Sequence, residues 1–236
     1  MARFTPKGKK MCFSPVASFT ASAALAVIGV VTLRKTKAPQ DWLLASLPLL
    51  FAAQQFTEGL LWLALLQGKT GAGPYWLTQA YAVFAGILLP LIIPLGIFLI
   101  EPNNIRRRWL AVLFLIGAGV AAYTLSIIAR FGFEAEISNR CILYRHPAEQ
   151  GPHILLLYII ATCAAFFCSS ERGLLWIGIA NIWSFAAAYY FYQVNLVSAW
   201  CFFAAVLSGM LCLYFEHRKN AKHGPGNALQ PTNHPA

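Results

Sequence analysis

Long apolar runs separated by short polar connections dominate the chain. Backbone polar groups cannot stay unpaired in lipid, and the runs lack the alternating pattern of barrel strands, so we expect helices. Each run is close to the roughly 20 apolar residues that a helix needs to cross a bilayer. The pattern predicts an all-α integral membrane protein, a bundle of seven transmembrane helices. The predicted helices cover, approximately, residues 15–33, 42–67, 77–100, 109–129, 153–170, 174–191 and 197–215.

The composition supports a membrane protein. Of the 236 residues, 58% are hydrophobic and 11% are charged, whereas soluble domains carry about 25% charged residues. The mean hydropathy is +0.60, and no polar half of the chain could form a separate soluble domain. The main partner is therefore the lipid bilayer.

The net charge of +10 comes from basic residues in the connections. They do not form a stripe along a helix face, so we predict no nucleic-acid partner. Ten Lys and Arg fall on one side of the predicted bundle: Arg34, Lys35, Lys37, Arg106, Arg107, Arg108, Arg172, Arg218, Lys219 and Lys222. Cytoplasmic connections are enriched in basic residues, so we predict the N-terminus outside and the C-terminus in the cytoplasm.

The two ends of the chain differ from the membrane domain at residues 11–215. Residues 1–10 form a basic extension before Met11, which is an alternative start, so the extension need not belong to the natural product. Residues 216–236 are polar and contain Gly and Pro, which predicts a disordered cytoplasmic tail.

Glu58 is the only charged residue inside a predicted span, and no span contains Lys or Arg. An ionised carboxylate in the membrane is costly, so we expect Glu58 to be protonated, bound to a cation or ligand, or facing a water-filled cavity. Gln54, Gln55 and Trp62 share its helix face by their spacing. A purely structural glutamic acid, hydrogen-bonded to a neighbouring helix, is the alternative interpretation.

Three cysteines fall near the predicted outer face: Cys12, Cys141 and Cys201. In an oxidising periplasm Cys141 could form a disulfide with Cys12 or Cys201. A reactive thiol and an unpaired structural cysteine are the alternatives. His146 and His153 lie near Cys141, but their spacing matches no zinc motif. We therefore predict no metal site, and no motif assigns a cofactor.

Three stretches carry a resemblance to a known family. They are Met11-Cys12-Phe13-Ser14 with Ala17-Ser18-Phe19, then Gln54-Gln55 with Glu58-Gly59 and Trp62, and Ser198 with Trp200-Cys201-Phe202-Phe203-Ala204-Ala205. Together they resemble a family of uncharacterised bacterial multi-pass membrane proteins that begin with a Met-Cys-Phe-Ser signature. The similarity covers about residues 11–215. It implies a multi-pass protein of the bacterial inner membrane without an assigned activity, and it again singles out Cys12, Glu58 and Cys201.

These observations favour a transporter, channel or sensor that binds a cation or small polar ligand in an outward-facing cavity around Glu58. An alternative is a membrane enzyme that uses Glu58 as acid or base and Cys12 or Cys201 near the outer surface. A third hypothesis is an assembly partner without a small ligand, and a homo-oligomer is compatible with the sequence. The candidate ligand-binding residues are Glu58, Gln54, Gln55, Trp62, Cys12, Trp200 and Cys201.

Overall fold

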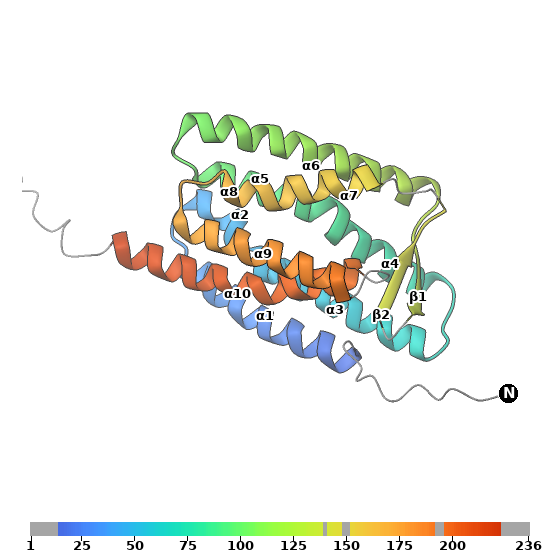
Figure 1. Ribbon diagram of the computed structural model, residues 1–236. Coiled ribbons are helices and arrows are strands. Elements are labelled where there is room, and N and C mark those ends of the chain that lie inside the picture. The colour runs from blue at the N-terminus through green and yellow to red at the C-terminus, as the bar shows by residue number, and fades with distance from the viewer. Residues whose placement is uncertain (1–13, 139–140, 148–151, 192–195, 223–236) are drawn as a thin grey trace, which may run out of the picture.

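The computed structural model describes residues 14–138, 141–147, 152–191 and 196–222. It is a helical bundle in which the long helices run side by side along one axis (Figure 1). Within the described residues, six helices are long and apolar enough to cross a membrane. They are α1 (Pro15–Lys35), the Pro39–Leu66 segment, the Ala72–Ile100 segment, α6 (Asn104–Arg130), α9 (Arg172–Phe191) and α10 (Leu196–Lys222).

Two of these spans consist of several consecutive elements. The second span contains the short helices η1 (Pro39–Asp41) and α2 (Trp42–Ala45), followed by α3 (Leu47–Leu66). The third contains α4 (Ala72–Val83), the π-helical turn η2 (Phe84–Leu88) and α5 (Leu89–Ile100). Both remain single apolar spans of the expected kind, so the prediction of a multi-pass membrane protein is confirmed.

The predicted span at 153–170 is shorter in the structure than the six long spans. It folds as α7 (Pro152–Ile159), the π-helical turn η3 (Ile160–Ala164) and α8 (Ala165–Phe167). Residues His153–Phe167 extend roughly 23 Å, less than the hydrocarbon core of about 30 Å. The helix ends before Ser169 and Ser170, which we assigned to it and which instead bind Glu101.

Small residues bring α1 and α3 together. Ser18 and Ser22 are buried on one face of α1, and the Ser22 hydroxyl donates to the carbonyl of Ala52 at 2.8 Å. Further along the same helix, a Cβ at Gly29 would lie 2.6 Å from the Leu49 side chain. Ser18, Ser22 and Gly29 are small residues that allow α1 and α3 to pack closely, as is common between membrane helices.

Prolines shape the third span. Pro90 has no N–H to bond the carbonyl of Gly86, and the preceding turn η2 widens to a π-helix. Pro94 likewise leaves the carbonyl of Pro90 without its helical partner. Helix α6 packs against that carbonyl at Gly117, where any Cβ would clash with the Pro90 oxygen.

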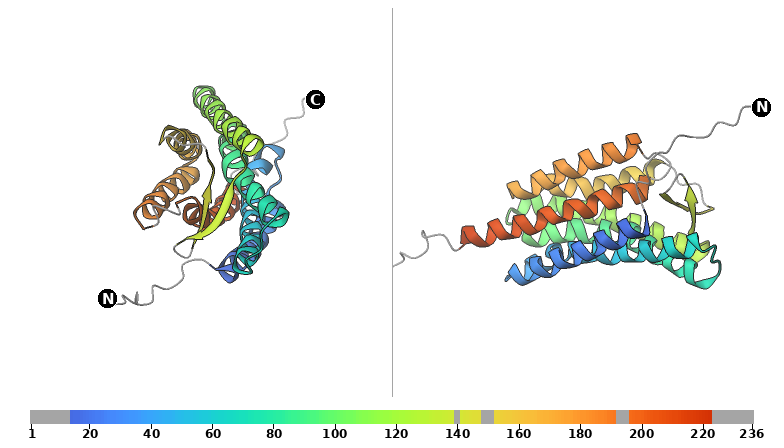
Figure 2. Two further views of the ribbon diagram at one scale, coloured as in Figure 1. Left: turned by 90° about the vertical axis from the view of Figure 1, so that its right-hand side faces the viewer. Right: turned by 90° about the horizontal axis from the view of Figure 1, so that it is seen from below.

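A β-hairpin interrupts the helical pattern at one end of the bundle. Strands β1 (Glu134–Ser138) and β2 (Cys141–Arg145) pair antiparallel, with Glu134 opposite Arg145 and Ile137 opposite Ile142. The segment lies between the predicted helices at 109–129 and 153–170, and we expected no strand in it. Figure 2 (left) shows the hairpin crossing the bundle between α7 and α9 on one side and α3 and α4 on the other. We call this the hairpin end, and the opposite end the tail end.

Ion pairs connect the helices at the tail end. The Arg218 Nη1 lies 2.9 Å from Asp41 Oδ1, and its Nε lies 3.8 Å from Glu171 Oε1. Lys35 pairs with Glu216 at 3.1 Å. Helix α10 extends to Lys222, past the predicted boundary at 215, so the predicted tail begins inside a helix. Residues 223–236 lie outside the described part of the chain.

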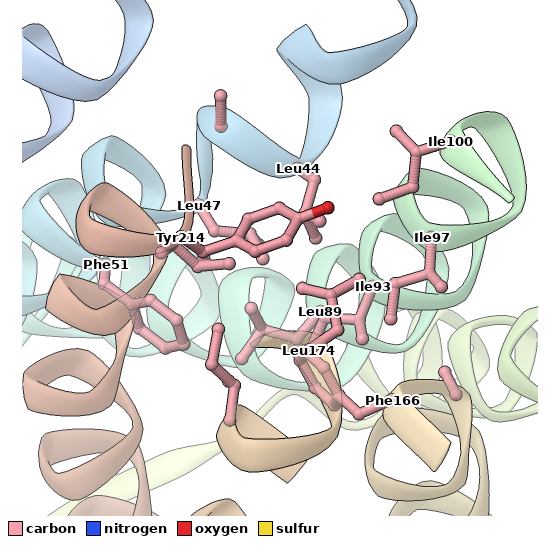
Figure 3. Packing of buried hydrophobic residues seen from close by; sticks show 14 of the residues in the cluster. Leu44, Leu47, Phe51, Leu89, Ile93, Ile97, Ile100, Phe166, Leu174 and Tyr214 are labelled. Carbon is pink, nitrogen blue, oxygen red and sulfur yellow. The ribbon is translucent and has the colours of Figure 1, made fainter. Parts of the chain in front are cut away.

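The main apolar core lies towards the tail end. Helices α2, α3, α5, α8, α9 and α10 contribute to it, with Tyr214 packed over Leu44 and Leu47 and with Phe166 near Leu174 (Figure 3). Towards the hairpin end the buried residues are more polar and more aromatic. Glu58 lies in this more polar half of the bundle.

Candidate functional site

Glu58 lies in the middle of α3 and is 1% exposed. The Ser198 hydroxyl donates a hydrogen bond to its Oε1 at 2.5 Å, and Gln55 Nε2 donates to its Oε2 at 3.3 Å. Ser198 belongs to the first turn of α10, where unpaired backbone N–H groups give a partial positive charge that favours a nearby carboxylate. Each carboxylate oxygen thus accepts one bond, and no described Lys or Arg is paired with Glu58.

The side chains predicted to share a face with Glu58 are all buried. Gln54 is 1% exposed, Gln55 is 0% exposed and Trp62 is 3% exposed. Three of their polar atoms have no hydrogen-bond partner among the described residues: Gln54 Nε2, Gln55 Oε1 and Trp62 Nε1. A buried polar atom left unpaired costs about 1–3 kcal/mol. Such a cluster is therefore unexpected for a purely structural interior.

Two tyrosines that the sequence analysis did not select complete this polar cluster. Tyr81 of α4 and Tyr144 of β2 stack with their rings parallel and their centroids 4.2 Å apart. Neither hydroxyl has a hydrogen bond of good geometry to any described residue, although Tyr81 lies beside the Cys201 thiol. Burial, followed by the nearby Glu58 charge, raises the pKa of Tyr144 well above its usual value. Tyr144 is therefore a neutral phenol at physiological pH.

A cavity of about 150 Å³ adjoins this cluster on the α6 and α7 side. Five aromatic side chains and several aliphatic ones form its walls, together with one thiol, one imidazole and one threonine hydroxyl. The lining residues are Tyr81, Ala82, Ala85, Gly86, Val120, Thr124, Phe133, Tyr144, His146, Ile154, Leu155, Tyr158, Leu196, Trp200 and Cys201.

The cavity contains only part of the predicted site. Trp200 and Cys201 line it, but Glu58, Gln54, Gln55 and Trp62 do not. Glu58 accepts a hydrogen bond from Ser198 of α10 and is an electrostatic neighbour of Tyr81 and Cys201. A cavity directly around Glu58 therefore stays a prediction, because this cavity includes only Trp200 and Cys201 of the predicted residues. Cys12 lies outside the described residues.

One π-helical turn borders the cavity, and the other is linked to a lining residue through Asn181. Turn η2 contributes Ala85 and Gly86 to the wall. Turn η3 holds Cys163, whose sulfur accepts a hydrogen bond from Asn181 Nδ2 at 3.4 Å. The oxygen of the same Asn181 side chain accepts from Trp200 Nε1 at 3.3 Å, which orients the Trp200 ring at the cavity. Wide π turns within helices are frequent at functional sites.

The cysteines do not form the predicted Cys141–Cys201 disulfide. Cys201 has a free thiol and packs with Tyr81 and Ala85, whereas Cys141 packs in a separate cluster with Trp62 and Ile142. Pairing with Cys12 falls outside the described residues. Within residues 14–138, 141–147, 152–191 and 196–222, no group of three or more His, Cys, Asp or Glu side chains is arranged to hold a metal ion.

Buried glutamate also occurs at the tail end, but there it is fully satisfied. Glu101 is 2% exposed and accepts hydrogen bonds from Asn103 N, Ser170 N and the hydroxyls of Ser169 and Ser170. Burial opposes its ionisation, yet these bonds together lower the pKa of Glu101 below the usual 4.5. Glu101 is thus a structural carboxylate, in contrast to Glu58 with its incompletely bonded neighbours.

Comparison with known proteins agrees with the resemblance noted in the sequence. A family described as a family of unknown function (DUF6629) matches residues 11–226. No curated protein and no solved structure matches the chain significantly. The family match covers most of the chain, including α3, the hairpin and α10, which together hold the polar cluster. The chain therefore belongs to the DUF6629 family of unknown function.

Proposed function

We propose that this protein is a membrane transporter, channel or sensor that binds a cation or small polar ligand in the cavity next to Glu58. One observation carries the proposal. Unpaired buried polar atoms of Gln54, Gln55, Tyr81 and Tyr144 gather around an uncompensated carboxylate, and two of these side chains line a cavity. A ligand that reaches the cavity would satisfy some of these atoms and offset the carboxylate charge.

The proposed topology places the cavity towards the outside of a bacterial inner membrane. The basic connections before Asp41 and around Arg106, Arg172 and Arg218 belong to the tail end, which is held together by the Arg218 and Glu101 contacts. Basic residues favour the cytoplasmic side. The hairpin end, with Tyr144 at the cavity, then faces outward.

The enzyme hypothesis has weaker support. Glu58 and Cys201 do converge, but the Cys201 thiol lies between the Tyr81 hydroxyl and the Gln54 amide, and neither group is a base. Both Glu58 oxygens already accept hydrogen bonds from Ser198 and Gln55. An activated nucleophile requires a base within hydrogen-bond reach, so the arrangement favours binding over covalent catalysis.

Ligand-induced thermal stabilisation of the purified protein in lipid nanodiscs tests the proposal. The compounds are inorganic cations, small amines and ammonium ions, and neutral amides and alcohols. The variants are Glu58→Gln, which keeps the size but removes the charge, and Glu101→Gln, a matched change of a buried glutamate far from the cavity. We expect one class of compound to raise the Tm of the wild type and Glu101→Gln, but not of Glu58→Gln.

Two results would overturn the proposal. The first is the absence of stabilisation by every class at millimolar concentration. The second is stabilisation of Glu58→Gln equal to that of the wild type. Either result would return Glu58 to a structural role as a hydrogen-bonded residue between α3 and α10.

A further inference from the structure

The geometry points to a specific ligand class: a small alkylammonium cation, held by aromatic faces and balanced by the nearby Glu58 carboxylate. This inference rests on the proposed function, because it names the ligand of the same cavity. Three features support it: the residues that line the cavity, the charged groups near it and its volume.

Five aromatic side chains line the cavity, and four of them form two ring pairs. Tyr81 and Tyr144 stack on each other at a centroid distance of 4.2 Å, and Tyr158 meets Trp200 edge to face at 5.5 Å. Phe133 adds a fifth lining aromatic residue. Several aromatic faces around one small space attract a cation through their ring quadrupoles, as in sites that recognise quaternary ammonium groups.

The charges around the cavity favour a positive ligand. Among the lining residues there is no Lys, Arg, Asp or Glu, and His146 is the one lining residue with a basic side chain. Glu58, whose carboxylate is bonded to Ser198 and Gln55, is a close neighbour of the lining residues Tyr81 and Cys201. A buried carboxylate without a cationic partner gains from any positive charge brought near it in a medium of low dielectric constant.

A bare metal ion fits these walls poorly. Hard cations such as Ca²⁺ and Mg²⁺ require six or more oxygen ligands at about 2.0–2.6 Å. The lining offers mainly ring carbons and aliphatic groups, with oxygens from Thr124 and the tyrosine hydroxyls. An alkylammonium ion sheds its water more readily and presents methyl groups that pack against rings, so it matches this surface better.

The space also limits the size of the ligand. A cavity of about 150 Å³ is comparable to an apolar protein cavity that holds one benzene molecule. Tetramethylammonium and choline have about as many non-hydrogen atoms as benzene. The hydroxyl of choline could bond to the unpaired hydroxyl of Tyr81 or Tyr144. The ammonium group can belong to a free solute or to a lipid headgroup, because both present the same chemistry.

Isothermal titration calorimetry compares choline with its neutral carbon isostere, dimethylbutanol, in which carbon replaces the nitrogen. The full chain is used in nanodiscs of phosphatidylglycerol, so that no choline headgroup competes. We expect choline to bind at least about tenfold more tightly than the isostere, since the two differ only in charge. Repeating the titration in phosphatidylcholine nanodiscs separates the sources: weaker choline binding there indicates a headgroup ligand, and unchanged binding indicates a free solute.

Two variants report on the aromatic wall. Tyr158→Leu keeps an apolar side chain but removes a ring face, and we expect about a tenfold loss of choline affinity with little change for the isostere. Tyr190→Leu is the matched control, because Tyr190 is exposed on α9 and does not line the cavity. It should bind choline as the wild type does.

The outcomes separate the ligand class from the proposed function. If the isostere binds as tightly as choline, or if another class stabilises the protein while choline does not bind, the cavity is a binding site but the ammonium inference is overturned. If Tyr158→Leu and Tyr190→Leu bind choline equally, the aromatic wall has no part and the inference also fails. If no compound of any class binds, the proposed function itself fails.

Discussion

Ser198 and Glu58 lie 140 residues apart in the sequence, and the Ser198 hydroxyl donates a hydrogen bond to the Glu58 carboxylate at 2.5 Å. This contact joins the first turn of α10 to the middle of α3. Glu58 itself does not line the cavity, whereas its neighbours Tyr81 and Cys201 do.

We predict that Ser198→Ala destabilises the protein more than Ser208→Ala. Hydrogen bonds to charged groups contribute about 1.5–3 kcal/mol, and neutral ones about 0.5–1.5 kcal/mol. Ser208 is a matched control because it is also buried in α10, but its hydroxyl bonds only the Ala205 carbonyl in the same helix. Thermal unfolding in the same detergent measures both. Equal losses would mean that the bond to Glu58 contributes nothing special.

We predict that the protein loses stability in acid because Glu101 becomes protonated. Its pKa is lower in the folded protein than the usual 4.5, so the unfolded chain takes up its proton first as the pH falls. The stabilisation is complete above the unfolded pKa and is lost as the pH falls through the folded pKa. Glu101→Gln should flatten the decrease of Tm below about pH 4.5. Glu136→Gln, on the exposed hairpin, should leave that decrease as in the wild type.

We predict that two ion pairs at the tail end contribute unequally to the free energy of unfolding. Arg218→Met leaves the Asp41 carboxylate, with a side chain 7% exposed, without its partner at 2.9 Å. Loss of one member of a buried pair costs about 3 kcal/mol. Lys35→Met breaks the more exposed pair with Glu216 and should cost less than about 1 kcal/mol. Chemical unfolding distinguishes them, and adding Asp41→Asn to Arg218→Met should recover part of the loss.

Membrane orientation can be measured with single engineered cysteines in a variant whose native cysteines are replaced by alanine. We expect Glu134→Cys, in the hairpin, to react with an impermeant maleimide in intact cells. Gln40→Cys, at the tail end, should react only after permeabilisation. The opposite pattern would reverse the topology proposed from the basic connections.

The helical architecture was accessible from the sequence because each long span is a continuous apolar run. The segment at 153–170 shows that hydropathy alone does not locate the end of a helix. Ser169 and Ser170 looked like the end of an apolar helix, but their backbone and hydroxyl groups instead bind Glu101, which is remote in sequence. Because Glu101 is 68 and 69 residues away in the sequence, the residues around 169 and 170 contain no signal for this contact.

The candidate site was accessible only in part. Glu58 was identifiable because a charge inside an apolar run is rare, and the spacing placed Gln54, Gln55 and Trp62 on its buried face. Tyr81 and Tyr144 could not be selected, because tyrosines near a membrane surface usually anchor helices there. Only the hairpin brings Tyr144 over Tyr81 and so forms one wall of the cavity.

The most direct test of the link between Glu58 and the cavity is ligand protection of Cys201, whose thiol lines the cavity. Mass spectrometry follows its alkylation by a small neutral reagent, with and without the compound that raises the Tm most. Cys212, near the other end of the same helix, is the internal control. The account predicts that the ligand slows alkylation of Cys201 in the wild type but not in Glu58→Gln, and leaves Cys212 unchanged. Equal rates at Cys201 in the wild type with and without ligand would contradict it.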